Sequence, residues 1–567
     1  MTRARLGALL LPLIVAGGFA STSARAQVSG ETGEVFVFLV PGVSFEEMLG
    51  IPEVAALATN GGAALMTLQN GLPTEGEAGI APGEQNVHFR WLDPTREGGL
   101  EGVASMIVEM VTSVDDGSVL VFVASTTPSP EMIVAKDELH PLVLARGTPS
   151  DLFAERGEEG SLTSDSTRRA GVVTDLDVIP TIADFHGVDP RADSNGSPID
   201  IISGPPPFEL HQRYLAQRGM YVPIGTAGGI YLTIVGLGAI AILALGSRIP
   251  QVLRRIFGWG CLSVAALATA LLAAGHLPEL TYATVIPFVG LVTVFGTLAF
   301  APLERRDVLL VPAGIGIAVL AYFALEAILE WTAALTPFVG GSELDGGRFY
   351  GLPNVFIGLL IGSCLWVAHR LRTGAGVALL VAVALFAGLP YVGANLGGGV
   401  SLFAAAGLWL AVRQRERLGV WKGLGVFVGV TLLGAALILF AHAISPFETH
   451  VTRFEEEVSG ISGVFERFGD RLQVGFDLIA HNPFALIPVI GLPVAIAAVL
   501  RPPAVLRPSL ERSPAWRDAI LVTLLAGVVA YLVNDSGPAA AGLAFGLGLG
   551  GLLGVSLLSE AGKMGEP

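Results

Sequence analysis

The sequence predicts an α/β domain followed by an all-α membrane bundle of about eleven helices, because of its composition and the placement of its apolar residues. Hydrophobic residues make up 52% of the 567 residues and charged residues 14%, whereas about 25% of a typical soluble domain is charged. The apolar excess lies in residues 225–558, as runs separated by short charged loops. Residues 28–220 combine acidic loops with short apolar runs, which is typical of a soluble α/β domain.

The first 26 residues have the features of a signal peptide. Arg3 and Arg5 form a basic start, residues 6–20 form an apolar core, and Ala24-Arg25-Ala26 is a small-x-small cleavage site. The apolar core is shorter than the roughly 20 residues of a membrane span. An uncleaved signal anchor is the alternative. In both cases the residues that follow, 27–220, are expected to be extracytoplasmic.

The apolar runs of the C-terminal part, 221–567, are long enough, or nearly so, to cross about 30 Å of hydrocarbon as helices. We expect spans at 225–246, 256–275, 281–302, 308–331, 354–369, 376–391, 397–412, 422–443, 483–500, 517–533 and 537–558. The loops and tail expected inside hold sixteen Lys and Arg residues, and the loops expected outside hold four. Since basic loops stay in the cytoplasm, this bias predicts a multi-pass inner-membrane protein with a cytoplasmic C-terminus.

The exported domain reads as alternating strands and helices. Strands are expected at 35–40, 61–66, 118–124 and 139–145, and helices at 45–60, 102–114 and 175–187. This order predicts an α/β domain with a parallel core. The formal net charge of −16 argues against a nucleic-acid partner, which would need a basic face. Both cysteines, Cys261 and Cys364, fall in expected spans, so the exported domain can form no disulfide.

Three segments of this domain resemble the alkaline phosphatase-like superfamily. They are the first strand ending in Pro41-Gly42, residues 138–147 (ELHPLVLARG), and residues 162–189 (LTSDSTRRAGVVTDLDVIPTIADFHGVD). The last contains the D-x-x-P-T-x-x-x-x-x-G pattern of the superfamily, here Asp177, Pro180, Thr181 and Gly187. The resemblance covers most of 34–190 and implies an alkaline phosphatase-like fold. In active members of the superfamily, Asp and His side chains at strand ends hold two metal ions.

Two expected metal-ligand positions depart from this pattern. Pro41 stands where the first strand normally ends in Asp, and residues 124–128 (ASTTP) stand where a late strand normally ends in Asp-His. Divalent ions need carboxylate or imidazole ligands, so we expect no metal cofactor and no phosphatase activity. Arg168 and Arg169 then become the candidates for contact with a phosphate or polyanion. The alternative is a structural loop in which they pair with local acids.

The membrane part has three features expected on the outer side. One is a glycine-rich loop before the fifth span, with the candidate substrate-binding residues Asp345, Tyr350 and Asn354 and the candidate catalytic residue Arg348. Another is the segment 390–399, in which Asn395 is a candidate binding residue, with close helix packing as the alternative. The third is the amphipathic segment 444–482, with His450 and Arg453, whose alternative reading is a linker helix that shields the bundle.

Residues 348–358 (RFYGLPNVFIG) and 471–491 (RLQVGFDLIAHNPFALIPVIG) resemble segments of the O-antigen ligase and polymerase superfamily. This resemblance implies glycan transfer from a polyprenyl-linked precursor, with Arg348 and Arg453 holding the diphosphate and His450 as base. The α/β domain would position an envelope polymer acceptor. Glu326, in the fourth span, is a further functional candidate and would suit an ion path equally well. A transporter or flippase, a non-enzymatic envelope scaffold and an active metallohydrolase are the competing functions.

Overall fold

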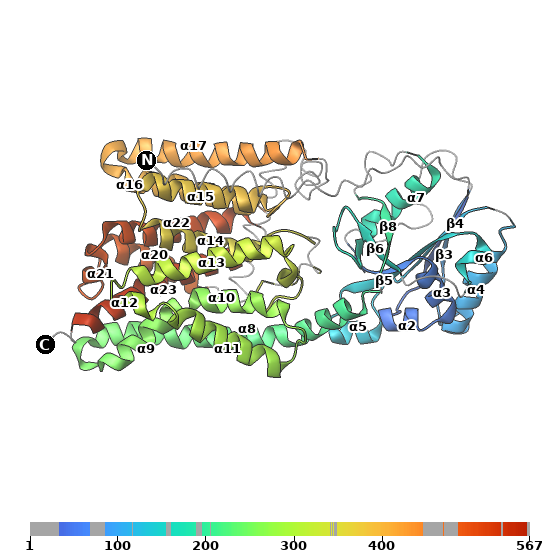
Figure 1. Cartoon of the computed structure of the whole chain (residues 1–567), viewed down its shortest axis with the longest axis horizontal. Helices are drawn as coiled ribbons and strands as arrows, with labels where there is room; N and C mark the ends of the chain where they lie inside the picture. Colours follow the sequence, from blue (N-terminus) through green and yellow to red (C-terminus); the bar gives the residue numbers. More distant parts are fainter. Residues whose placement is uncertain are drawn as a thin grey trace.

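The computed structural model describes residues 33–68, 86–115, 117–154, 160–188, 196–204, 206–340, 342, 344, 349–445, 469, 486–534 and 537–563. Within these residues, an α/β domain lies at one end of an elongated molecule and a helical bundle at the other (Figure 1). The expected signal peptide and nearly all of the amphipathic segment 444–482 lie outside the described residues. The end of the bundle next to the α/β domain is called proximal below, and the opposite end distal.

An eight-stranded mixed sheet forms the centre of the α/β domain. Its strands are β1 (Glu34–Leu39), β2 (Gly62–Thr67), β3 (Val87–Trp91), β4 (Val119–Ala124), β5 (Leu139–Gly147), β6 (Gly160–Ser164), β7 (Val172–Thr174) and β8 (Ile199–Ser203). Their order is β3-β1-β4-β5-β2-β6-β8, with β7 paired to β2. All four expected strands are present, but β5 runs antiparallel to β4 and β2, and β8 runs antiparallel to β6.

The expectation of a purely parallel core is therefore corrected. The chain leaves β4, forms the short helix α5 (Pro130–Ala135) and returns as the neighbouring strand β5. This connection lies at the end of the sheet that faces the bundle, where α5 contacts the helix that leads into the bundle. A parallel return would have required a crossover over a sheet face.

Helices cover both faces of the sheet (Figure 1). Phe36 and Phe38 of β1 pack in the cluster that holds α2 (Phe45–Leu49), α3 (Pro52–Asn60) and α4 (Leu100–Thr112). The alternate residues of β1 pack with α7 (Val178–His186) on the other face. The short α6 (Pro149–Leu152) completes the domain. The expected helix 45–60 is broken, because Pro52 starts a second helix after Gly50.

The rest of the chain is helical. The helices are α8 (Phe208–Leu245), α9 (Gln251–Leu262), α10 (Val264–Ala273), α11 (Tyr282–Leu298), α12 (Ala301–Glu304), α13 (Leu310–Ile328), α14 (Ile357–Ala368), α15 (Thr373–Gly388), α16 (Leu396–Arg413), α17 (Arg415–Ala443), α20 (Leu486–Leu500), α21 (Arg507–Glu511), α22 (Pro514–Val533) and α23 (Gly537–Lys563). Among the described residues, seven helices are long and apolar enough to cross a membrane, or eight if α9 and α10, bent by 46°, form one span. Shorter apolar helices occupy the other expected positions, so the protein is multi-pass and the count of eleven stays a prediction.

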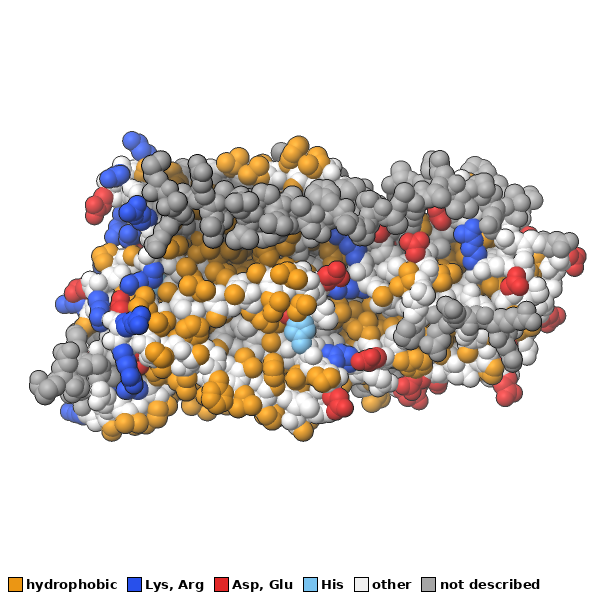
Figure 2. All heavy atoms as spheres, in the orientation of Figure 1, with side chains coloured by type: hydrophobic (Ala, Val, Ile, Leu, Met, Phe, Trp, Pro, Cys, Tyr) orange, Lys and Arg blue, Asp and Glu red, His pale blue; other side chains and the backbone are white. Residues whose placement is uncertain are grey.

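The two ends of the bundle differ in charge. Figure 2 shows Lys and Arg side chains gathered at the distal end of the visible face. Ion pairs at this end include that of the buried Arg254 with Glu560 at 2.5 Å. The described proximal loops, residues 277–281, 329–340, 349–353 and 389–395, contain no Lys or Arg. This is the distribution expected if the α/β domain lies outside the cytoplasm.

The long helix α8 connects the two parts and contacts both. His211 and Asp137 form a buried pair at 2.7 Å, which fixes the first turn of α8 to the α/β domain. Two turns further on, Gln217 donates to the Pro337 carbonyl at 2.5 Å. Arg213 donates to carbonyls of the loop that follows α10. The expected domain boundary at residue 220 therefore falls inside one continuous helix.

Candidate functional site at the contact between the domain and the bundle

The carboxyl edge of the sheet meets the proximal end of the bundle. The strands β1, β2, β4, β6 and β7 run in the same direction, so their carboxyl ends share this edge. The loop between α13 and α14 packs against it. Leu344 and Phe349 are buried in the same hydrophobic cluster as β2 and β5, and Thr67, at the end of β2, donates to the Leu344 carbonyl at 3.0 Å.

The two arginines named from the sequence lie in this contact. Arg169 donates through Nε to the Phe349 carbonyl at 2.7 Å and through Nη2 to the Glu330 carbonyl. The guanidinium of Arg168 lies 4.1 Å from the centre of the Tyr350 ring, a cation–π arrangement. Arg168 also lies within electrostatic range of His442, near the end of α17. Both arginines therefore face the membrane domain.

The backbone on both sides of this contact is left-handed at residues other than glycine. Arg168 has a φ of 52°, and Glu330 and Trp331 have φ values of 54° and 60°. Such conformations cost about 1–3 kcal/mol each and persist only where the surrounding structure holds them. Here the Glu330 carbonyl accepts from Arg169, and the Trp331 indole donates to the Val392 carbonyl at 2.8 Å.

The hydroxyl groups of residues 163–169 (TSDSTRR) mostly form hydrogen bonds within the α/β domain. Ser164 donates to Asp177 at 2.7 Å, and Thr167 donates to the Val172 carbonyl at 2.6 Å. Asp177 also accepts from the backbone N–H groups of Thr174 and Ser197. Ser166 differs, because its buried hydroxyl has no hydrogen-bond partner among the described residues. The geometry of this loop thus rests on Asp177.

The turn after β1 and the segment after β4, singled out in the sequence, lie side by side. The backbone N–H of Gly42, which follows Pro41, donates to the Thr127 carbonyl at 3.1 Å. Nearby on β5, His140 is buried, and burial lowers the pKa of its imidazole, partly offset by the carboxylates of Asp137 and Asp175. In the described ranges, no three His, Cys, Asp or Glu side chains lie close enough together to share a metal ion.

A second polar group lies near the proximal end of the bundle. Glu326 of α13 is fully buried, and its Oε1 accepts from Tyr322 at 2.7 Å and from His276. Its Oε2 has no hydrogen-bond partner within the described part of the chain. The His276 side chain is 33% exposed and so connects this carboxyl group to the surface. Ionisable groups buried at this position in a membrane helix are candidates for a functional role.

Tyr322 and His276 are not among the site residues expected from the sequence. Tyr322 stands four residues before Glu326, so helical spacing places both side chains on one face and could have identified the pair. His276 lies fifty residues away on another helix, and only the fold brings it to Glu326. His442, near Arg168, was also missed; its Nε2 donates to the Gly388 carbonyl at 3.0 Å.

The structure brings Asn354 and Asn395 together. The Asn395 side chain is fully buried and donates to the Asn354 side chain at 2.9 Å and to the Leu352 carbonyl at 2.8 Å. Its oxygen accepts from the Gly398 N–H at 2.7 Å, which caps α16. The Asn395 amide is thus engaged in holding the 352–354 segment against α16. The other expected site residues, Asp345, Arg348, His450 and Arg453, lie outside the described residues.

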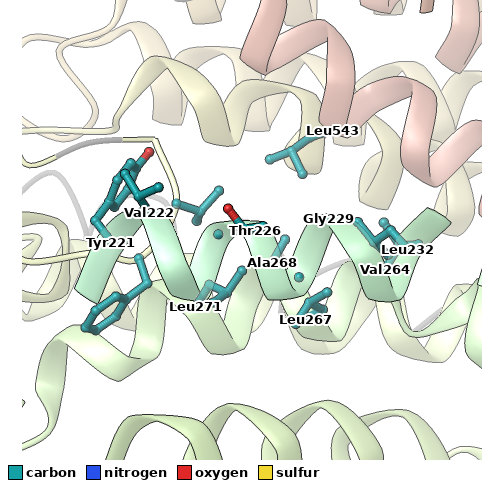
Figure 3. Close-up of a pocket in the computed structure, with 14 residues that line it drawn as sticks. Tyr221, Val222, Thr226, Gly229, Leu232, Val264, Leu267, Ala268, Leu271 and Leu543 are labelled. Atoms are coloured by element: carbon teal, nitrogen blue, oxygen red, sulfur yellow. The ribbon is translucent and has the colours of Figure 1, made fainter. Parts of the chain in front are cut away.

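An apolar groove of about 490 Å³ lies along α8, between α10 and α23. Figure 3 shows Thr226 and Gly229 of α8 and Leu267 and Leu271 of α10 around it, with Leu543 on the far side. It is hollow because α8 presents glycine here. A Cβ added at Gly225 or Gly229 would meet no atom within 4 Å. A groove of this kind inside a membrane span suits a hydrocarbon chain.

Comparisons of the chain with protein-family models, with curated proteins and with solved structures give no match.

Proposed function

We propose that this protein acts at the outer face of the inner membrane of a bacterial cell envelope, where it transfers a lipid-linked glycan or a related precursor. The α/β domain binds the phosphate-bearing acceptor and does not hydrolyse it. One observation carries the proposal: the carboxyl edge of the sheet, with Arg168 and Arg169, lies against the bundle. A ligand held at this edge is therefore also next to the membrane.

The proposed reaction needs no nucleotide. The acceptor hydroxyl oxygen attacks the anomeric carbon of the glycan, and the bond from that carbon to the diphosphate oxygen breaks. The electron pair stays with the polyprenyl diphosphate, and the hydroxyl proton passes to a base. We assign the base to His450 and the diphosphate contacts to Arg348 and Arg453, as the resemblance to the O-antigen ligase and polymerase superfamily implies. The groove along α8 supports a lipid-linked donor, because it can hold part of the chain.

The test uses the full chain in nanodiscs, with a fluorescent glycan on polyprenyl diphosphate as donor and envelope glycan as acceptor. We expect label to move to the acceptor with wild type, and to fall at least 100-fold with Arg348→Gln or His450→Gln. Arg467→Gln, a basic residue of the same expected outer segment, is the matched control. Absence of transfer by wild type, together with an unchanged envelope after deletion of the gene, would end the proposal.

The same protein tests the loss of hydrolysis. A phosphatase assay with added Zn²⁺ or Mn²⁺ should give no metal-dependent turnover, because Pro41 and the 124–128 segment supply no carboxylate or imidazole. Clear metal-dependent turnover that is lost with a chelator would establish an active hydrolase and contradict this part of the proposal.

A proton-coupled transporter or flippase is the second candidate, favoured by the buried Glu326 with His276 and by the bent helix pair α9–α10. A transporter would move the fluorescent donor across the bilayer of proteoliposomes without breaking the glycosidic bond. Glu326→Gln would then stop movement, and Glu330→Gln would be the control. A scaffold would show neither transfer nor movement.

A further inference from the structure

A second groove, of about 610 Å³, opens at the distal end of the bundle between α16, α17, α20 and α22. Its walls are mostly apolar, with Leu408, Phe427 and Leu521 among the residues that form them. Its polar lining residues are Arg415, Glu416, Arg517 and Asp518. The groove thus combines a charged part with a hydrocarbon-lined part, and its volume is within the usual range of roughly 300–1,000 Å³ for ligand pockets.

The arginines of this groove keep donors for a ligand. The side chain of Asp518 is only 4% exposed, and it accepts from Arg413 at 2.9 Å and from Arg415 at 2.7 Å. Two guanidinium groups on one carboxylate leave one positive charge uncompensated. Arg517 donates through Nε and Nη2 to backbone carbonyls at the end of α20. In the described part of the chain, Nη2 of Arg415 and Nη1 of Arg517 have no hydrogen-bond partner.

The depth of the groove in the membrane follows from α17. Gly419, with a φ of 65°, interrupts this helix, and the Trp421 side chain just after it is 83% exposed. An exposed tryptophan next to Lys422 is typical of the boundary between lipid headgroups and hydrocarbon. Phe427 lies six residues further along α17, or about 9 Å deeper at the helical rise. The charged part therefore lies at headgroup depth and the apolar walls in the hydrocarbon.

We propose that this groove binds an anionic phospholipid of the leaflet at the distal end, the expected cytoplasmic leaflet. The phosphate lies between Arg415 and Arg517, and an acyl chain lies against Phe427 and Leu521. Charge complementarity selects the ligand, because six basic residues line the groove or lie within two positions of a lining residue in the sequence, and the acids of the lining are Glu416 and Asp518. The basic residues are Arg413, Arg415, Arg417, Lys422, Arg501 and Arg517. Basic pockets between membrane helices bind anionic headgroups in this way.

The test uses the full chain in nanodiscs made of phosphatidylcholine with or without phosphatidylglycerol, followed by native mass spectrometry of the released protein. Wild type should retain one phosphatidylglycerol in preference to phosphatidylcholine. The double variant R415Q/R517Q should lower this occupancy at least tenfold. R305Q/R306Q removes the same charge from exposed positions at the same end, and should retain the lipid as wild type does.

Two results on wild type keep the test independent of how well the variants fold. Equal retention of the neutral and anionic lipids would overturn the proposal, because charge would not select the occupant. Displacement of the lipid by soluble glycerol phosphate at low millimolar concentration would also overturn it, since a free phosphate would then suffice without an acyl chain. Retention of phosphatidylglycerol against both competitors supports it.

Discussion

Substitution of Phe349, in the loop between α13 and α14, tests how the α/β domain is held on the bundle. Its side chain is only 1% exposed and packs in the cluster of β2 and β5. Truncation of a buried Phe to Ala costs about 3–5 kcal/mol, because the transfer free energy is lost and a cavity remains. Phe349→Ala keeps the backbone carbonyl that accepts from Arg169. The loss should therefore fall on apolar docking, while the sheet retains its own core.

Hydrogen exchange of the full chain in detergent or nanodiscs measures this loss. Where closing is fast relative to exchange, 3–5 kcal/mol corresponds to an acceleration from about 100-fold to several thousand-fold. We expect it at the docking segment, such as the Leu352 amide that bonds to the Gly393 carbonyl, and at the end of β2. Ile133→Ala, at a position that is 64% exposed, should leave exchange unchanged.

Two outcomes would refute this reasoning. Unchanged exchange at the docking segment would mean that Phe349 contributes little to the contact. Equal acceleration in β3 and β8, far from the loop in the strand order, would mean that Phe349 belongs to the folding core of the α/β domain and not to its docking.

Three further predictions concern buried polar residues at or near the contact between the domain and the bundle. Asp177→Ala removes the acceptor of three hydrogen bonds and should cost on the order of 3 kcal/mol in unfolding free energy, seen as a lower thermal midpoint, whereas the exposed Asp184→Ala should not. Asn395→Ala should cost about 1–3 kcal/mol by removing the cap of α16, and unchanged thermal unfolding would contradict this. Burial lowers the pKa of the His140 imidazole in the folded state below the unfolded value of 6.5. The contribution of His140 to the free energy of unfolding is therefore complete above pH 6.5 and is lost as the pH falls below it. His140→Gln should flatten this pH dependence of thermal unfolding, and His186→Gln should not.

The sequence identified the strands whose residues are buried on both faces. The apolar runs of β1 and β4 could be read directly, because both faces of these strands are covered. The edge strands β3 and β8 were not expected, because polar residues such as His88, Arg90 and Asp200 interrupt their apolar residues and only one residue of each is buried. The direction of β5 was also missed, because direction depends on which edge the chain re-enters and not on strand composition.

The site was only partly predictable for the same reason. Arg168 and Arg169 could be named from their motif, but their partners Tyr350 and Phe349 lie about 180 residues further along the chain. Contacts at this distance depend on how α8 orients the two parts. The pairing of Tyr322 with Glu326, within one helix, was accessible from spacing, whereas the pairing of Glu326 with His276 was not.

The core of the α/β domain includes side chains from α8 and from the bundle, which matters for every experiment on this domain. Tyr214 comes from α8, and Leu344 and Phe349 come from the bundle, yet all three are at most 1% exposed within the core of this domain. A fragment that ends before α8 would lose these side chains and expose the apolar surface they cover. It would also leave Asp137 without His211. Binding or hydrolysis by such a fragment would therefore report on an altered carboxyl edge of the sheet, so these measurements need the full chain.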